Sequence, residues 1–117
     1  MRNFRKYNFL KNGIEIVKDA YQISKLLPSD EKFGLRSLVT RTAISIPSNI
    51  AEGSSRNSDL DFKRFLEIAM GSAFELETQL ILIEELKLCP VEKLSQIKEK
   101  LLNEQKMINK FIEKLKS

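Results

Sequence analysis

The sequence contains no histidine, and this absence removes several classes of enzyme at once. Without an imidazole there is no Ser-His or Cys-His nucleophile pair, no zinc site that needs histidine, and no helical ribonuclease built on an arginine–histidine pair. The serines of the polar stretch at 45–58 have no histidine to activate them, and its pattern is neither G-x-S-x-G nor S-x-x-K. We therefore predict no catalytic residue and no enzymatic activity.

Cysteine and long apolar runs are also scarce. The lone cysteine, Cys89, cannot form an intrachain disulfide, which favours a reducing compartment. No window approaches the roughly 18 apolar residues of a membrane span. The basic N-terminal stretch MRNFRKYNFLKNG lacks the apolar core of a signal peptide. We expect a cytoplasmic protein with no contact to a membrane.

Strand signals are missing as well, because no segment sustains a period-two alternation of apolar and polar residues. Instead, apolar residues recur at helical spacing in four segments, at about 12–27, 30–52, 58–88 and 91–115. The joins between these segments are short, which favours antiparallel neighbours. The length suits a single domain, 1–117. The predicted fold is all-α, an antiparallel up-down-up-down four-helix bundle.

The stretch SIPSNIAEGSSRNS at 45–58 joins the second and third helices. Pro47 has no N–H, so it would remove one helical hydrogen bond and kink the second helix rather than end it. Gly53 is expected to end that helix. Ser58 is expected to cap the third helix with its hydroxyl. The stretch therefore indicates a helix junction rather than an active site.

The third helix carries more apolar residues than one bundle core can bury. One set, from Phe62 to Ile83, falls within a single arc, as a core face should. Two further stripes lie on either side of that arc: Met70, Phe74 and Ile81 on one, and Ile68, Leu82 and Leu86 on the other. One reading is a broad core contact with some tolerated exposure. The other, which we favour, is an interface between subunits of a homo-oligomer, formed by Met70, Gly71, Phe74 and Ile81.

The predicted topology gives the bundle a charge asymmetry. Residues 1–11, 52–64 and 106–117 must lie at one end, and they hold eleven basic residues against four acidic ones. The opposite end, 25–36 and 84–93, holds five of each. The formal net charge of +4 therefore belongs to a molecule that is basic at one end.

Helix dipoles explain only part of this asymmetry. Lysines near the end of the fourth helix complement its dipole, but Arg56, Lys63 and Arg64 lie near a helix N-terminus, where cations are unfavourable. We predict that the basic end binds a polyanion through backbone phosphates rather than by base stacking, because few aromatic residues accompany it. The predicted nucleic-acid-binding residues are Arg2, Arg5, Lys6, Lys11, Arg56, Lys63, Arg64, Lys110 and Lys114.

Two groups of charged residues allow other interpretations. Glu52, Asp59 and Asp61 could hold magnesium, but helix capping explains the two aspartates more simply, so we predict no metal and no cofactor. The second group, mid-helix on apolar segments, comprises Arg41, Glu75 and Glu77. It fits either a solvated surface or a structural ion pair at a helix–helix or subunit contact. Both interpretations of the second group stay open.

The stretch FGLRSLVTRTAISIPSNIAEGSSRNSDLDFKRFLEIAMGSAFELETQL, at 33–80, resembles the signature of a known family. The matching parts are TRTAISIP, NIAEG with the arginine that follows, FLEIA and GSAFELETQL. On these motifs the chain is similar to a bacterial family of four-helix-bundle proteins, first noticed in intervening sequences of large-subunit ribosomal RNA genes. The residues at the motif positions are Arg41, Asn49, Glu52, Gly53, Arg56, Glu75 and Glu77.

The resemblance also implies partners. The family is similar to the accessory variability protein of diversity-generating retroelements, which forms a pentameric barrel of bundles. That relative binds nucleic acid through a basic surface and associates with a reverse transcriptase. The resemblance therefore implies a homopentamer, RNA or DNA as the ligand, and a reverse transcriptase as a partner protein.

Three hypotheses of function remain at this point. The leading one is a non-enzymatic, oligomeric protein that binds RNA or DNA phosphates through its basic end. The alternative is a protein-interaction scaffold in which the basic end serves solubility alone. The third, a metal-dependent nuclease, requires magnesium-dependent cleavage that Asp61→Asn abolishes.

Overall fold

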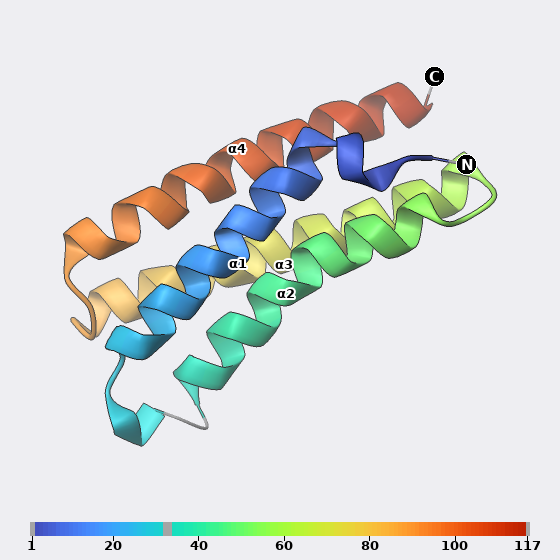
Figure 1. The fold of residues 1–117 in the computed structure, drawn as a ribbon. Coiled ribbons are helices and arrows are strands. Elements are labelled where there is room, and N and C mark those ends of the chain that lie inside the picture. The colour runs from blue at the N-terminus through green and yellow to red at the C-terminus, as the bar shows by residue number, and fades with distance from the viewer. Residues whose placement is uncertain (1, 32–33, 117) are drawn as a thin grey trace.

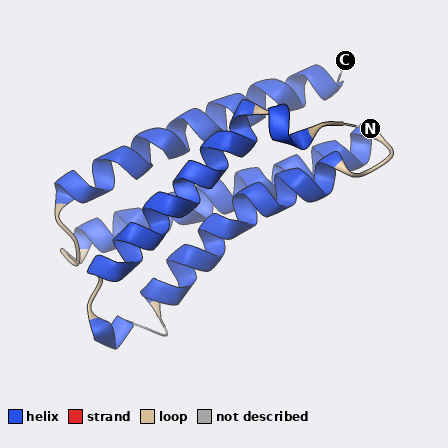
Figure 2. Cartoon of the chain, viewed as in Figure 1, coloured by secondary structure: helices blue, strands red, loops and turns tan. Residues whose placement is uncertain are grey.

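The structure, a computed structural model, describes residues 2–31 and 34–116. Its elements, in chain order, are η1 (Phe4–Lys6), α1 (Asn8–Leu26), η2 (Ser29–Glu31), α2 (Leu35–Ser54), α3 (Asp59–Glu85) and α4 (Val91–Lys116) (Figure 1). The two elements labelled η are single turns of 3-10 helix. Figure 2 shows helices joined by short loops, and the described ranges contain no strand.

The four long helices run alternately up and down and lie side by side. α2 packs against α1 and α3, and α4 packs against α3 and α1, so each helix has two neighbours. The molecule is elongated, with extents of 45 × 23 × 19 Å. The predicted all-α, up-down-up-down four-helix bundle is therefore confirmed. Each amphipathic helix can cover its apolar stripe only by facing others, which is why short connections produce this architecture.

The core follows the bundle axis and takes aliphatic side chains from all four helices. Ile16 of α1, Ile46 of α2, Leu76 of α3 and Leu101 of α4 are all buried. Burying one side chain of this size stabilises the fold by about 1.5–3 kcal/mol. The apolar surface is thus turned inward, and none of the helices in the described ranges has the length and apolarity to cross a membrane.

Two helices begin away from their predicted positions. α1 begins at Asn8 rather than near residue 12, because Phe9 is already buried in the core and extends the apolar face by a turn. α2 begins at Leu35 rather than near residue 30. There the carboxylate of Glu31 accepts a hydrogen bond from the Leu35 backbone N–H at 3.3 Å, which satisfies a free donor at the helix start.

α3 ends at Glu85, three residues before the predicted end, because the chain turns in a Schellman motif. The backbone N–H of Leu88 donates to the carbonyl of Ile83, and that of Lys87 donates to the carbonyl of Glu84, each at 3.0 Å. These two bonds satisfy carbonyls that the helix end leaves free. Lys87 has φ of 55°, the left-handed conformation that glycine usually supplies at this position.

The junction of α2 and α3 agrees with the sequence-based interpretation in two respects. Pro47 lies inside α2, and the side-chain amide of Asn49 donates to the carbonyl of Ser45 at 2.7 Å. The hydroxyl of Ser58 accepts a hydrogen bond from the backbone N–H of Asp61 at 3.1 Å, so it caps α3 as predicted. The serine-rich stretch is therefore a helix junction built from caps and local hydrogen bonds.

The role predicted for Gly53 was wrong. Gly53 lies within α2, which continues to Ser54, rather than at its end. A Cβ atom on Gly53 would lie 2.5 Å from the Cβ of Phe65 and 3.1 Å from the Cδ1 of Phe62. Glycine is needed here because α2 and α3 approach too closely for any side chain.

Candidate nucleic-acid interface

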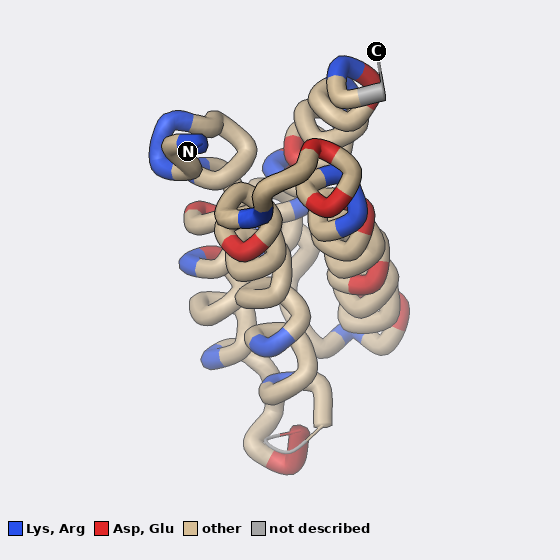
Figure 3. The backbone as a smooth tube through the Cα atoms, turned by 90° about the vertical axis from the view of Figure 1, so that its right-hand side faces the viewer, with Lys and Arg blue, Asp and Glu red and all other residues tan. Residues whose placement is uncertain are grey.

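The N-terminal segment, the α2–α3 turn and the end of α4 lie at the same end of the bundle (Figure 1). Figure 3 looks onto this end and shows Lys and Arg positions in all three segments, with Asp and Glu positions among them. The shared end predicted from topology is therefore confirmed. Its chemistry depends on which cations already have an acidic partner, because a paired cation attracts a phosphate less strongly.

Arg2 holds the N-terminal segment against the α2–α3 turn. Its guanidinium donates to the carboxylate of Asp59 and to the backbone carbonyl of Arg56, both at 2.5 Å. The same group lies over the ring of Phe62, 4.7 Å from its centroid. These contacts use most of the guanidinium donors, so Arg2 acts mainly as a structural link.

Two further arginines predicted to bind nucleic acid also have acidic partners. Arg56 contacts Glu52 at 3.1 Å and lies over the ring of Phe65, 4.7 Å from its centroid. Arg64 lies 3.6 Å from Asp61. All of these groups are solvent-exposed to a large degree, so the pairs are weak, but each carboxylate offsets the charge of its partner. The sequence holds a signal for both pairs, because Glu52 precedes Arg56 by four residues and Asp61 precedes Arg64 by three, the spacings at which side chains meet along a helix.

Aromatic rings close the core at this end. Tyr7 stacks on Phe9 with a centroid distance of 4.8 Å, and Phe111 meets both rings edge-on at 5.2 Å. Phe62 contacts Phe111 at 5.6 Å. Burial raises the pKa of the Tyr7 hydroxyl above its usual value. These rings stabilise the fold and present little free face to a nucleobase, which fits the prediction that bases are not stacked here.

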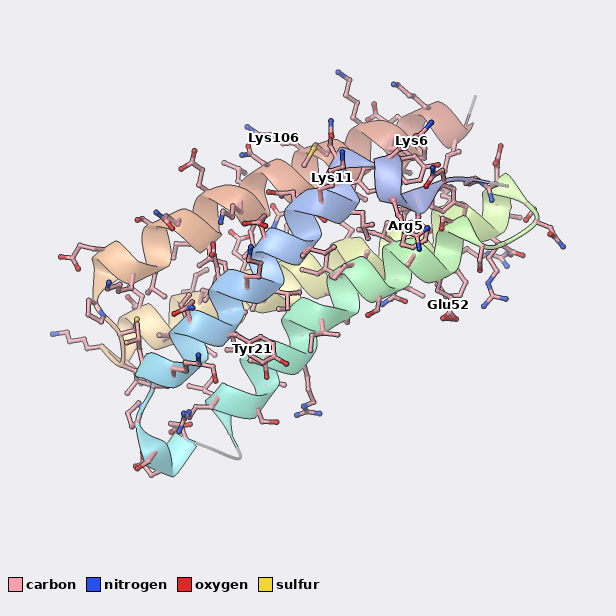
Figure 4. All side chains as sticks on the ribbon, viewed as in Figure 1. Arg5, Lys6, Lys11, Tyr21, Glu52 and Lys106 are labelled. Atoms are coloured by element: carbon pink, nitrogen blue, oxygen red, sulfur yellow. The ribbon has the colours of Figure 1, made fainter. Side chains whose placement is uncertain are left out.

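Four exposed lysines near this end have no ion-pair partner within the described ranges: Lys6, Lys11, Lys106 and Lys110. We call them the lysine group. Two come from η1 and α1 and two from α4, and α1 packs against both η1 and α4. Three of the four are labelled in Figure 4, where Lys6, Lys11 and Lys106 reach toward the upper side of the molecule and Arg5 points away from them.

Two contacts between α1 and α4 set the register of the lysine group. The Phe9 and Phe111 rings lie 5.2 Å apart, and the Asn12 side-chain amide lies 3.0 Å from the Glu104 carboxylate. Lys11 therefore lies at the same level as Lys106 and Lys110 along the bundle. The predicted binding set omitted Lys106, although its charge was counted at the basic end.

The remaining predicted binding residues differ from one another. Arg5 is exposed and lies over the ring of Phe4, 4.8 Å from its centroid. Lys63 is half-buried on α3. Lys114 is exposed but already engaged in an interaction. The side chain of Lys116, counted in the charge of this end, lies outside the described part of the chain.

The predicted subunit interface lies on the outer side of α3, at a groove shared with α4. The groove has a volume of about 290 Å³ and is lined by Met70, Phe74, Leu102, Gln105, Lys106 and Asn109. Phe74 is 54% exposed and Ile81 is 48% exposed, although both are large and apolar. A Cβ on Gly71 would meet nothing within 4 Å, so packing inside the chain does not require glycine there.

Arg41 and Glu75 are exposed, and neither forms an ion pair with another described residue of the chain. Glu77 instead accepts a hydrogen bond from the side-chain amide of Gln105 on α4 at 2.8 Å. The structural ion pair therefore does not form within one chain. An ion pair of Arg41 across two copies of the chain stays a prediction.

The aspartates considered as magnesium ligands have structural contacts. Asp59 pairs with Arg2, and the backbone of Asp61 is capped by Ser58. Within residues 2–31 and 34–116, no three Cys, Asp or Glu side chains are arranged to hold a metal ion.

A buried carboxylate was not predicted from the sequence. Glu104 on α4 is 0% exposed, and burial raises its pKa to about 7. The signal was present, because the apolar residues Leu94, Ile97, Leu101 and Ile108 follow a heptad-like spacing in which 104 is a core position. Because Glu104 is a charged residue type, its position alone did not lead to a prediction of burial.

The comparisons with known proteins bear on fold and family. The chain is similar in structure to a crystal structure of a protein of unknown function from the S23 ribosomal protein family of Bacteroides thetaiotaomicron. The TM-score is 0.82 at 24% identity, and the match covers 90% of this chain and 95% of that one. At this identity the likeness shows the fold alone. No curated protein matches the chain.

The family model described as 23S rRNA-intervening sequence protein matches residues 5–110. The match spans nearly all of the bundle, including the motifs at 33–80 on which the resemblance was based. The chain therefore belongs to the 23S rRNA-intervening sequence protein family.

Proposed function

We propose that this protein is a non-enzymatic nucleic-acid-binding protein that attracts the phosphates of RNA or DNA to its lysine group. The observation that carries this proposal is that Lys6, Lys11, Lys106 and Lys110 have no acidic ion-pair partner among the described residues, and that α1 packs against both η1 and α4. A lysine ammonium is a mobile point charge, well suited to phosphates whose positions vary with sequence. The binding is therefore independent of base sequence.

The arginines at the basic end are less available to a phosphate than the lysines. Arg2, Arg56 and Arg64 have carboxylate partners within 4.0 Å, so a phosphate would have to compete with Asp59, Glu52 and Asp61. The lysines of the group face no such competition. We expect the lysines to supply most of the affinity and the arginines to supply less.

Charge reversal tests this division. The double variant Lys11→Glu, Lys106→Glu should weaken binding to a fluorescent 20-nucleotide RNA by at least tenfold, measured by anisotropy at 50 mM salt. Lys25→Glu, Lys93→Glu is the matched control, because it makes the same charge change with exposed lysines at the opposite end. Equal losses in the two variants would show that net charge, rather than the lysine group, attracts the RNA.

We also propose that the working form is a homo-oligomer, with a pentamer implied by the family resemblance. Two features support it: the exposed apolar side chains at the α3–α4 groove, and a glycine at 71 that the chain's own packing does not need. Exposed Ile14, Tyr21 and Ile44 lie on α1 and α2, away from that groove. A cyclic oligomer needs two different complementary faces, and it would repeat the lysine group around one axis.

The alternative function, a protein-interaction scaffold, draws on the same exposed apolar residues. The two functions differ in their expected response to reversal of Lys6 and Lys11, which do not line the groove: a scaffold keeps its partner, whereas nucleic-acid binding weakens. The reverse transcriptase implied by the resemblance remains a proposed partner of either form. Copurification of a tagged chain with the enzyme, compared with the same purification of a Phe74→Asp variant, would test it.

A further inference from the structure

Three residues that are unfavourable in helical or buried positions meet at one level of the bundle. They are Gly13 of α1, Pro47 of α2 and Glu104 of α4, and Gly13 and Glu104 are buried. A Cβ on Gly13 would lie 3.1 Å from the Oε2 atom of Glu104 and 3.6 Å from the Cβ of Pro47. Gly13 therefore leaves the space that the carboxyl group occupies. Glycine and proline in the middle of a helix each destabilise it, so we infer that their position beside a buried acid has a structural role.

The carboxyl group of Glu104 links α4 to α1. Its Oε1 atom accepts a hydrogen bond from the side-chain amide of Asn12 at 3.0 Å, and the same amide donates to the carbonyl of Lys100 at 2.9 Å. The second oxygen, Oε2, is buried and has no hydrogen-bond partner in the described part of the chain. Burying an ionised carboxylate with one oxygen unbonded costs much free energy, because the negative charge is shared by both oxygens. Burying the neutral, protonated carboxyl group with its O–H unbonded costs less.

Within residues 2–31 and 34–116, no cation forms an ion pair with Glu104. On its own helix, Lys100 is 2.9 Å from Asp19 of α1, so its charge is already balanced. α1 presents the neutral Asn12 and Gly13, and α2 presents the apolar Ile46 and Pro47. On α3, the acid Glu77 accepts a hydrogen bond from Gln105, the residue that follows Glu104 on α4. Burial raises the pKa of Glu104 to about 7, and the Asn12 hydrogen bond opposes that rise only in part.

We propose that Glu104 is a proton-dependent brace between α1 and α4, closed when the carboxyl is protonated and loosened when it ionises. These two helices carry Lys11, Lys106 and Lys110, so loosening would disturb the arrangement of the lysine group. The effect of the brace on nucleic-acid binding rests on the proposed function. The brace itself does not depend on that function. Binding should accordingly be tighter at pH 6 than at pH 8.

The sign of the pH dependence follows from linkage. The pKa of Glu104 is about 7 in the folded chain against the ordinary glutamate value of 4.5, so between these values the folded chain holds a proton that the unfolded chain has lost. The contribution of Glu104 to stability is therefore greatest below pH 4.5, falls as the pH rises toward 7, and levels off above it. The unfolding constant should rise by about 300-fold in total from this one group. Because the chain has no histidine, no imidazole titrates in this window.

Urea denaturation of the full chain between pH 5 and pH 8.5 tests the brace. Glu104→Gln keeps the shape and removes the ionisation, so its unfolding constant should lack the rise that the natural chain shows. Glu99→Gln, an exposed change on the same helix, is the matched control and should keep that rise. Identical pH profiles for the natural chain and Glu104→Gln would overturn the brace.

Direct titration provides a second measurement that does not depend on how well the variants fold. The side-chain carboxyl carbon of Glu104, followed by NMR, should titrate near pH 7, and amide exchange in α1 and α4 should quicken above it. Titration of this carbon at an ordinary glutamate pKa would overturn the brace.

RNA binding at pH 6 and pH 8, in the natural chain and Glu104→Gln, tests the regulation. Tighter binding at pH 6 that disappears in Glu104→Gln would support it, and equal pH dependence in the two chains would contradict it. If neither chain binds RNA at either pH while the denaturation profiles differ as expected, the proposed function fails and the brace stands.

Discussion

Single residues in this bundle show how backbone geometry and close approach select side chains. Lys87 adopts a left-handed conformation that ends α3, although it is not a glycine. Gly53 lies between two phenylalanines where no Cβ fits, and Gly71 lies in open space where one would fit freely. The same residue type therefore has a packing reason at 53 and none within the chain at 71.

Lys87→Gly should stabilise the protein by about 0.5–1 kcal/mol, because glycine adopts a left-handed conformation without the steric cost borne by lysine. The free energy of unfolding in urea measures this change. Lys18→Gly is the matched control, since residue 18 lies mid-helix in α1, and it should destabilise by about 1 kcal/mol. A loss of stability in Lys87→Gly would contradict the conclusion that the left-handed conformation of residue 87 carries a steric cost for lysine.

Gly53→Ala should destabilise the protein by about 1–3 kcal/mol, because the new methyl group overlaps Phe65 and must separate α2 from α3. Gly71→Ala should instead stabilise the isolated chain by about 0.5–1 kcal/mol, as alanine does in an open helix. Calorimetry at low protein concentration compares the two. If both changes had the same sign, the close approach at 53 would not be the reason for its glycine.

At the scale of helices, the sequence pattern predicts the order, number and pairing of elements, because apolar spacing and short joins depend on local residues. The sequence pattern does not predict helix boundaries that depend on contacts between distant residues. Phe9 extends α1 by a turn because its ring packs against that of Phe111. The side chain of Glu31 accepts a hydrogen bond from the Leu35 backbone N–H, which sets the start of α2. Arg56 and Arg64 were predicted as binding residues on charge alone, although Glu52 and Asp61 precede them by four and three residues, spacings at which side chains pair along a helix. The heptad-like spacing of α4 places Glu104 in the core, against the exposure that its charge favours.

Phe74→Asp tests the α3–α4 groove as a subunit interface. A charge placed in a desolvated contact is costly, so the variant should be a monomer where the natural chain is an oligomer. Light scattering over a range of concentrations measures the mass. Val91→Asp is the control, because Val91 is also exposed and apolar but lies at the opposite end, and it should keep the assembly. A monomeric mass for the natural chain at every concentration would contradict the proposed oligomer.

The whole molecule combines an ordinary helical core with an uneven surface. Arginines at the tip secure the N-terminal segment and the α2–α3 turn, while the lysine group is exposed on α1 and α4 and on the turn that precedes α1. Apolar side chains remain exposed along α3. Lys106 belongs to the lysine group and also lines the α3–α4 groove, so the proposed polyanion-binding surface borders the proposed subunit interface along α4.

The salt dependence of RNA and duplex DNA binding tests the central claim most directly. If the lysine group contacts phosphates, log affinity should fall linearly with log salt concentration, with a slope on duplex DNA of about −3.6 for four contacts. Replacing Lys11 and Lys106 with glutamine should make that slope shallower by about 1.8. An affinity that is the same at 50 mM and 300 mM salt, or a slope unchanged by the two substitutions, would contradict the account.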